Sequence, residues 1–144
     1  MKHLRHSVLA ALVLLGGCAT FPPPEAPPPE PSARENSAVV ALMQNAREEV
    51  GAGRLAAAAA NIERALRIEP RNATLWHELA RINLHQGQPA RAAQFAAKSN
   101  ALAGEDLALR AANWRLIGQA RTQEGDHAGA EAAFAEAAAL DRRR

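Results

Sequence analysis

The sequence WHELARINLHQGQPARA at residues 76–92 decides the fold of this chain. It places Trp76, Leu79 and Ala80 before the turn residue Gly87 and the small residue Ala92. The same spacing of residues occurs once more further along the chain. The turn Gly and the small residue after it also occur once before residue 76. The later copy consists of Trp114, Ile117, Gly118, Gly125 and Ala130, and the earlier one of Gly53 and Ala58. A recurring period of about 34 residues is typical of stacked helix-turn-helix units, which mostly bind other proteins.

The chain from residue 36 onward predicts an all-α fold of about six helices. Alanine dominates this part, and strand-like alternation is absent from its sequence. Asn72 and Asp106 are good N-caps, and Pro89 suits a first helical turn. Gly53 and Gly87 suit the turns between paired helices. We therefore expect helices near residues 37–50, 55–68, 73–86, 89–104, 107–124 and 127–140.

This framework resembles the tetratricopeptide repeat over residues 39–144. Besides the residues named above, the matches are Leu42, Ala46, Ile62, Ala65, Pro70, Phe134 and Ala137. The resemblance implies a right-handed α-solenoid of three helix-turn-helix repeats, near residues 39–72, 73–106 and 111–144. Ser99 stands where the repeat has Ala, and Gly104 stands where it has Pro. Trp114 comes later than the period predicts, which indicates an insertion at residues 107–110 that we expect to lengthen the fifth helix.

Residues 1–17 are typical of an export signal, with a short basic stretch before an apolar stretch too short to span a bilayer. The signal ends at Leu15-Gly16-Gly17-Cys18, which resembles the bacterial lipobox and contains the only Cys of the chain. This resemblance implies cleavage before Cys18 and lipidation of its thiol and amine. Because Ala19 follows rather than Asp, it further implies delivery to the outer membrane, on the periplasmic face. A plain secretory signal with an incidental Cys is the alternative.

Residues 18–35 are expected to form a linker between the lipidated Cys and a folded domain at residues 36–144. The sequence FPPPEAPPPEP at residues 21–31 excludes helix and central strand and favours extended polyproline II. At roughly 3 Å per residue, such a linker spans on the order of 50 Å. We interpret it as a spacer that holds the domain away from the membrane. A proline motif docked by a partner is the alternative.

The charge balance gives no reason to expect binding to nucleic acid or to bulk lipid. The whole chain has 17 Lys and Arg against 15 Asp and Glu. Two of the basic residues lie in the export signal, so the mature chain is formally neutral. Its high calculated isoelectric point therefore does not indicate a polyanionic partner.

No residue pattern typical of catalysis or metal binding occurs in the mature sequence. His77 and His85 are more than two turns apart on one helix, which is too far for a shared metal. No free Cys remains once Cys18 is lipidated, and no Ser has the context of an activated nucleophile. A Gly-rich phosphate loop is also absent. We expect a protein that is not an enzyme and that needs no metal or cofactor.

The candidate binding surface is the concave face, which the first helix of each repeat lines in tetratricopeptide arrays. The inward-facing family positions carry over to Met43, Arg47, His77, Arg81, His85, Arg115 and Gln119. Arg47 and Arg81 are one repeat period apart and hence equivalent. With Arg115 they predict a basic ridge suited to a carboxylate or an acidic peptide. A solvated helix face with ordinary pairing between neighbouring side chains is the alternative.

The combination of lipobox, short Pro-rich spacer and small repeat domain resembles a family of bacterial outer-membrane lipoproteins that activate class A penicillin-binding proteins. Residues 75–81 and 98–104 resemble its pseudomonad branch. The resemblance implies non-catalytic activation of a bifunctional peptidoglycan synthase in cell-wall synthesis. A pilotin-like lipoprotein that assembles a secretin or a type IV pilus is the alternative. The sixth helix also lacks a polar capping helix after it, which makes self-association there a further hypothesis.

Overall fold

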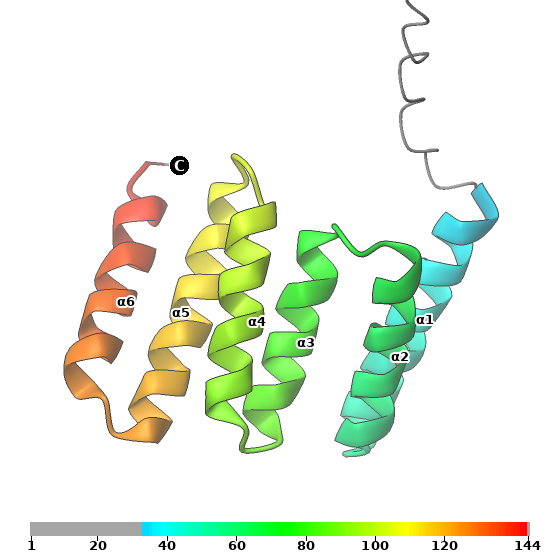
Figure 1. Ribbon diagram of the computed structural model, residues 1–144, viewed down its shortest axis with the longest axis horizontal. Helices are drawn as coiled ribbons and strands as arrows, with labels where there is room; N and C mark the ends of the chain where they lie inside the picture. The colour runs from blue at the N-terminus through cyan, green and yellow to red at the C-terminus, as the bar shows by residue number, and fades with distance from the viewer. Residues whose placement is uncertain (1–32, 144) are drawn as a thin grey trace, which may run out of the picture.

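The computed structural model describes residues 33–143, and this part of the chain folds into six α-helices without a strand. They are α1 Ala33–Gly51, α2 Leu55–Ile68, α3 Ala73–His85, α4 Pro89–Leu102, α5 Leu107–Glu124 and α6 His127–Asp141. Figure 1 shows them stacked in one row from α1 to α6. The all-α prediction is confirmed. None of these helices between residues 33 and 143 combines the length and apolar character that crossing a membrane requires.

The first helix starts earlier than the sequence predicts. It begins at Ala33, ahead of the expected start of the folded domain at residue 36. The predictions for residues 1–32, including the export signal, Cys18 and most of the linker, lie outside the described residues.

Side-chain caps and left-handed glycines determine where the helices begin and end. The Asn72 side chain accepts hydrogen bonds from the backbone N–H groups of Thr74 and Leu75, at 3.0 and 3.3 Å. Asp106 and Asp126 cap α5 and α6 in the same manner. Gly53, Gly87 and Gly125 take φ angles of 73°, 70° and 81° at the three turns within repeats, a region that other residues rarely adopt. The caps at Asn72 and Asp106 and the three glycine turns are those that the sequence predicts.

An exposed ion pair accompanies the first of these turns. The Arg54 Nε donates to the Glu49 carboxylate across the turn between α1 and α2. That hydrogen bond and the charge of Arg54 hold the pKa of Glu49 below its usual value. Because both side chains lie at the surface, the pair adds little to the stability of the turn.

Small residues let the two helices of each repeat approach closely. Ala46 and Ala58 lie between α1 and α2, and Ala80 and Ala92 occupy the equivalent places in α3 and α4. All four are at most 2% exposed. Larger side chains, among them Ile62, Leu75, Leu79 and Ile82, fill the core around them. Phe95 of α4 packs against both halves of this core and joins the first repeats to the last.

A buried polar network joins α3, α4 and α5. Asn113 of α5 is fully buried and donates to Ser99 Oγ at 2.8 Å and to Asn100 Oδ1 at 3.0 Å. Ser99 in turn donates to the carbonyl of Ala73 at 2.8 Å. The Nδ1 of His77 lies 2.7 Å from Asn113 Oδ1, and with an N–H at that nitrogen the imidazole donates to the carboxamide. Ser99, at a position where the repeat has Ala, thus links the second repeat to the third.

Candidate functional site: the concave groove

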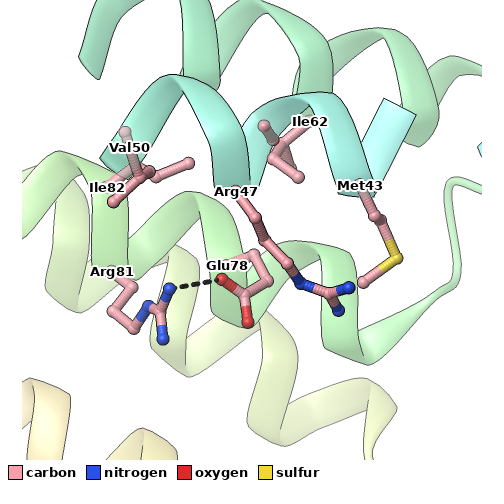
Figure 2. Close-up of a pocket in the computed structure, with 8 residues that line it drawn as sticks. Met43, Arg47, Val50, Ile62, Glu78, Arg81 and Ile82 are labelled. Carbon is pink, nitrogen blue, oxygen red and sulfur yellow. Dashed lines mark ion pairs between the residues drawn. The ribbon is translucent and has the colours of Figure 1, made fainter. Parts of the chain in front are cut away.

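A small hollow on the concave face lies between α1 and α3. Met43, Arg47 and Val50 of α1 line it, together with Glu78 and Arg81 of α3. Its volume is about 10 Å³, which is room for one water molecule. Figure 2 shows Arg47 and Arg81 on either side of Glu78, with an ion pair of 3.1 Å between Arg81 and Glu78. This end of the face therefore carries two arginines and one carboxylate.

A larger hollow continues from it between α3, α5 and α6. Its volume is about 580 Å³. The side chains that line it are Arg81, Leu84, His85, Leu116, Gln119, Thr122, Gln123 and Phe134. Arg81 lines both hollows, so they form one continuous surface, which we call the concave groove. The groove has an apolar part at Leu84, Leu116 and Phe134 and a polar rim, the composition of a typical peptide-binding surface.

The charge of the groove lies at its α1 end. Arg47 is exposed, and among residues 33–143 it makes no ion pair. The Arg81 side chain is 44% exposed and is partly neutralised by Glu78. An ion pair this exposed is weak, so Arg81 can exchange Glu78 for a carboxylate of a partner at small cost.

Five of the seven predicted concave residues lie in the groove, namely Met43, Arg47, Arg81, His85 and Gln119. His77 and Arg115 do not line it. His77 is half-buried against Asn113, as described above. Arg115 pairs with Asp141 at the end of α6. Both residues therefore connect helices of the fold.

Of the three arginines in the predicted ridge, Arg47 and Arg81 line the groove and Arg115 does not, which follows from the register of the third repeat. A 34-residue period counted from Trp76 would place the next Trp at position 110, but the insertion at the start of α5 moves it about one helical turn later, to Trp114. Counted from these tryptophans, Arg115 is equivalent to His77, and Gln119 is equivalent to Arg81. The groove thus presents Arg47, Arg81 and Gln119 in successive repeats, with Arg115 one turn away on α5.

Phe134 is the aromatic residue among the groove residues that sequence reasoning missed. Its ring rests on Gly118, where an added Cβ would lie 2.6 Å from the Phe134 Cε1. The residue remains 40% exposed, and it lines the larger hollow. Equivalent places in the other repeats hold Ala46 and Ala80, so the Gly at position 118 was the signal in the sequence. Its missing methyl group makes room for the ring beside the groove.

Gly118→Ala is expected to lower the free energy of unfolding by about 1 kcal/mol, although Ala is the better helix former. The new methyl group would displace the Phe134 ring from its position on α5. In a Phe134→Ala background the same change should become stabilising, because the ring is gone and only the helix propensity remains. Urea unfolding of the four variants measures both values. A stabilising Gly118→Ala in the native background would contradict this packing.

Within the described residues, no group of three or more His, Cys, Asp or Glu side chains is placed to hold a metal ion. The groove offers arginine, amide, hydroxyl and imidazole groups beside an apolar surface. This combination suits a protein segment with acidic and apolar side chains.

Paired antiparallel helices stacked around a concave groove define an α-solenoid of the tetratricopeptide type. The sequence model of the tetratricopeptide repeat matches residues 49–112. The globular C-terminal domain of LpoP from P. aeruginosa is 42% identical, with a TM-score of 0.68. The match covers 69% of this chain and 93% of that domain. The chain therefore belongs to the tetratricopeptide repeat family, with the LpoP domain as a relative.

A more distant structure shows the same fold. The N-terminal domain of stress-induced protein-1 (STI-1) from C. elegans has a TM-score of 0.70 at 20% identity. The match covers 76% of this chain and 88% of that domain. No curated protein matches the chain significantly in sequence.

Proposed function

We propose that this protein is a non-catalytic lipoprotein that activates a bifunctional peptidoglycan synthase, a class A penicillin-binding protein. The observation that carries the proposal is the 42% identity to the LpoP domain, across 93% of that domain. The lipoprotein family that the sequence resembles activates such synthases. The pilotin-like alternative gains no support from the fold or from the similar structures.

The concave groove is the proposed docking surface for the synthase. Arg47 and Arg81 receive acidic side chains, and Phe134 receives an apolar one. Met43, His85 and Gln119 complete the contact. A groove that binds the active conformation of the synthase more tightly than the inactive one shifts the synthase toward activity without doing chemistry.

In this proposal the N-terminal segment anchors the protein to the outer membrane. Removal of residues 1–17 leaves Cys18 as the lipidated first residue in the outer membrane, and the Pro-rich linker carries the repeats into the periplasm toward the wall. Self-association through α6 stays a hypothesis. The face of α6 that carries Ala132 and Ala135 is exposed, and the mass of the protein in solution tests it.

The test is a synthase assay with and without residues 33–144. We expect these residues to raise glycan polymerisation and crosslinking by the synthase of the same organism several-fold. The rise should saturate with the added domain, since it depends on a stoichiometric complex. Heat-unfolded domain serves as the control. Unchanged synthase activity together with no binding in a pull-down would contradict the proposal.

A further inference from the structure

A second groove, away from the concave face, contains the aromatic pair of the second repeat. Trp76 of α3 and Phe95 of α4 form one side of it, with ring centroids 5.6 Å apart. Leu66 and Leu79 form its apolar base, and both are less than 9% exposed. The volume is about 280 Å³. We call this surface the aromatic groove.

The aromatic pair is held in place by a hydrogen bond at the loop and by packing against the core. The Trp76 indole N–H donates to the carbonyl of Pro70 at 2.9 Å, which fixes the ring near the loop between α2 and α3. Ala96 lies one repeat period after Ile62 and occupies the equivalent core position. Phe95 immediately precedes that position, so its ring lines the groove as well as touching the core.

Two arginines flank the aromatic groove. The Arg91 guanidinium lies 5.7 Å from the centroid of the Phe95 ring, and Arg67 of α2 lines the groove directly. Both are exposed, and neither makes an ion pair within residues 33–143. Glu63 is the one acidic residue that lines the groove. The surface thus combines aromatic rings with a net positive rim.

The proline-rich segment of this chain has the complementary chemistry. Residues 21–31 contain seven prolines, Glu25 and Glu30, and no basic residue. Extended proline segments bind grooves lined by aromatic rings, because the rings pack on proline and little conformational entropy is lost. The two carboxylates match the charges of Arg67 and Arg91.

The segment also joins the domain at the correct end. It leads into α1 at Ala33. Figure 1 shows the start of α1 and the loop between α2 and α3 at the same edge of the row of helices, the upper edge in this view. Trp76 lies in the first turn of α3, directly after that loop. Eleven residues in polyproline II span about 34 Å, whereas packed helices lie about 10 Å apart. The segment is therefore long enough to cross α2 and enter the groove.

We propose that the aromatic groove binds residues 21–31 of its own chain. Docking would shorten the linker and hold the repeats close to the N-terminal anchor, and release would extend their reach. This inference goes beyond the activation of a synthase, and only the effect on reach rests on the proposed anchor at Cys18.

The first test replaces residues 22–31 by a Gly-Ser sequence of equal length in the full chain, purified in detergent. The protein contains two tryptophans, so a Trp114→Phe variant assigns the indole N–H signal of Trp76 by NMR. We expect the Trp76 signal to shift on replacement, and acrylamide quenching of Trp76 to rise about two-fold as packed prolines are exchanged for solvent. The proposal is wrong if the replacement leaves the indole N–H signal of Trp76 in place in the chain that keeps Trp114, and also leaves the acrylamide quenching of Trp76 unchanged.

Charge reversal gives the second test. Arg67→Glu with Arg91→Glu should expose Trp76 as the replacement does, and adding Glu25→Lys with Glu30→Lys should restore its protection. Arg64→Glu is the matched control, since Arg64 is exposed on the same helix and does not line the groove. If the variant with all four charges reversed leaves Trp76 exposed, the proposed ion pairs between the two arginines and the two glutamates of the segment are wrong.

Dilution separates this chain's own segment from that of a second chain. Protection of Trp76 within one chain is independent of protein concentration, whereas protection by a second copy is lost on dilution. Loss on dilution would overturn the proposal as stated, because the occupant would then be the linker of another molecule.

Discussion

Asn113→Ala is expected to lower the free energy of unfolding by about 2–4 kcal/mol, since it leaves a cavity and removes the partner of several buried polar groups. Ser99 Oγ loses a donor, and Asn100 Oδ1 loses another. The His77 imidazole loses its acceptor in a half-buried place. All three contacts join the last repeat to the one before it, so α5 and α6 should also exchange amide hydrogens faster.

Asn83→Ala is the matched control for this substitution. Asn83 is 2% exposed, and its amide donates to the carbonyl of Leu79 in its own helix. Its loss should cost about 1 kcal/mol, because that carbonyl can keep its helical hydrogen bond. A double-mutant cycle of Asn113→Ala with Ser99→Ala in urea should give a coupling of about 1 kcal/mol or more. Equal costs for the two Asn substitutions and no coupling would contradict a network that joins the repeats.

Arg47→Glu combined with Arg81→Glu is expected to weaken binding of the synthase by about ten- to one-hundred-fold and to abolish most of the activation. Both guanidinium groups line the concave groove at its α1 end. Reversal removes two positive charges and places two new carboxylates, one on either side of Glu78, which repel an acidic partner. Binding measured at two salt concentrations should also lose much of its salt dependence.

A double variant outside the groove controls for net charge. Arg64→Glu with Lys98→Glu changes the charge equally, and both residues are exposed on α2 and α4 outside the concave groove. We expect this variant to bind almost as the native protein does. If both double variants weaken synthase binding equally, the arginines of the groove attract the synthase only through the net charge of the domain. Full activation by the groove variant, with unchanged stability, would place the synthase on another face.

The helices were predictable because their signals are local and repeat. Asn72, Asp106 and the turn glycines lie at positions where backbone geometry favours only a few residue types. The long fifth helix followed from the spacing of the tryptophans, and α5 indeed has 18 residues against 13 in α3. The first helix extends back to Ala33 because the proline-rich sequence ends at Pro31 and no residue after it prevents helix formation.

The candidate site was less predictable because its contacts join residues on different helices. Ser99 and Gly118 were visible as departures from the repeat, but their partners Asn113 and Phe134 each lie on the next helix of the chain. Arg115 and His77 were assigned to the groove because they occupy the same inward-facing position of the repeat family, one residue after the repeat Trp. A family position gives the face of a helix, but it does not show that His77 bonds Asn113 or that Arg115 pairs with Asp141.

The insertion at the start of α5 gives the concave groove a polarity. Before it, the equivalent positions hold Arg47 and Arg81, and after it Gln119 takes that position. Positive charge therefore lies at the α1 end, and the apolar surface of Phe134 lies at the α6 end. A partner segment with one acidic and one apolar end fits in a single orientation, because the reverse would leave carboxylates against Phe134. The acidic end then points toward the first repeat, the end of the stack at which the N-terminal segment joins.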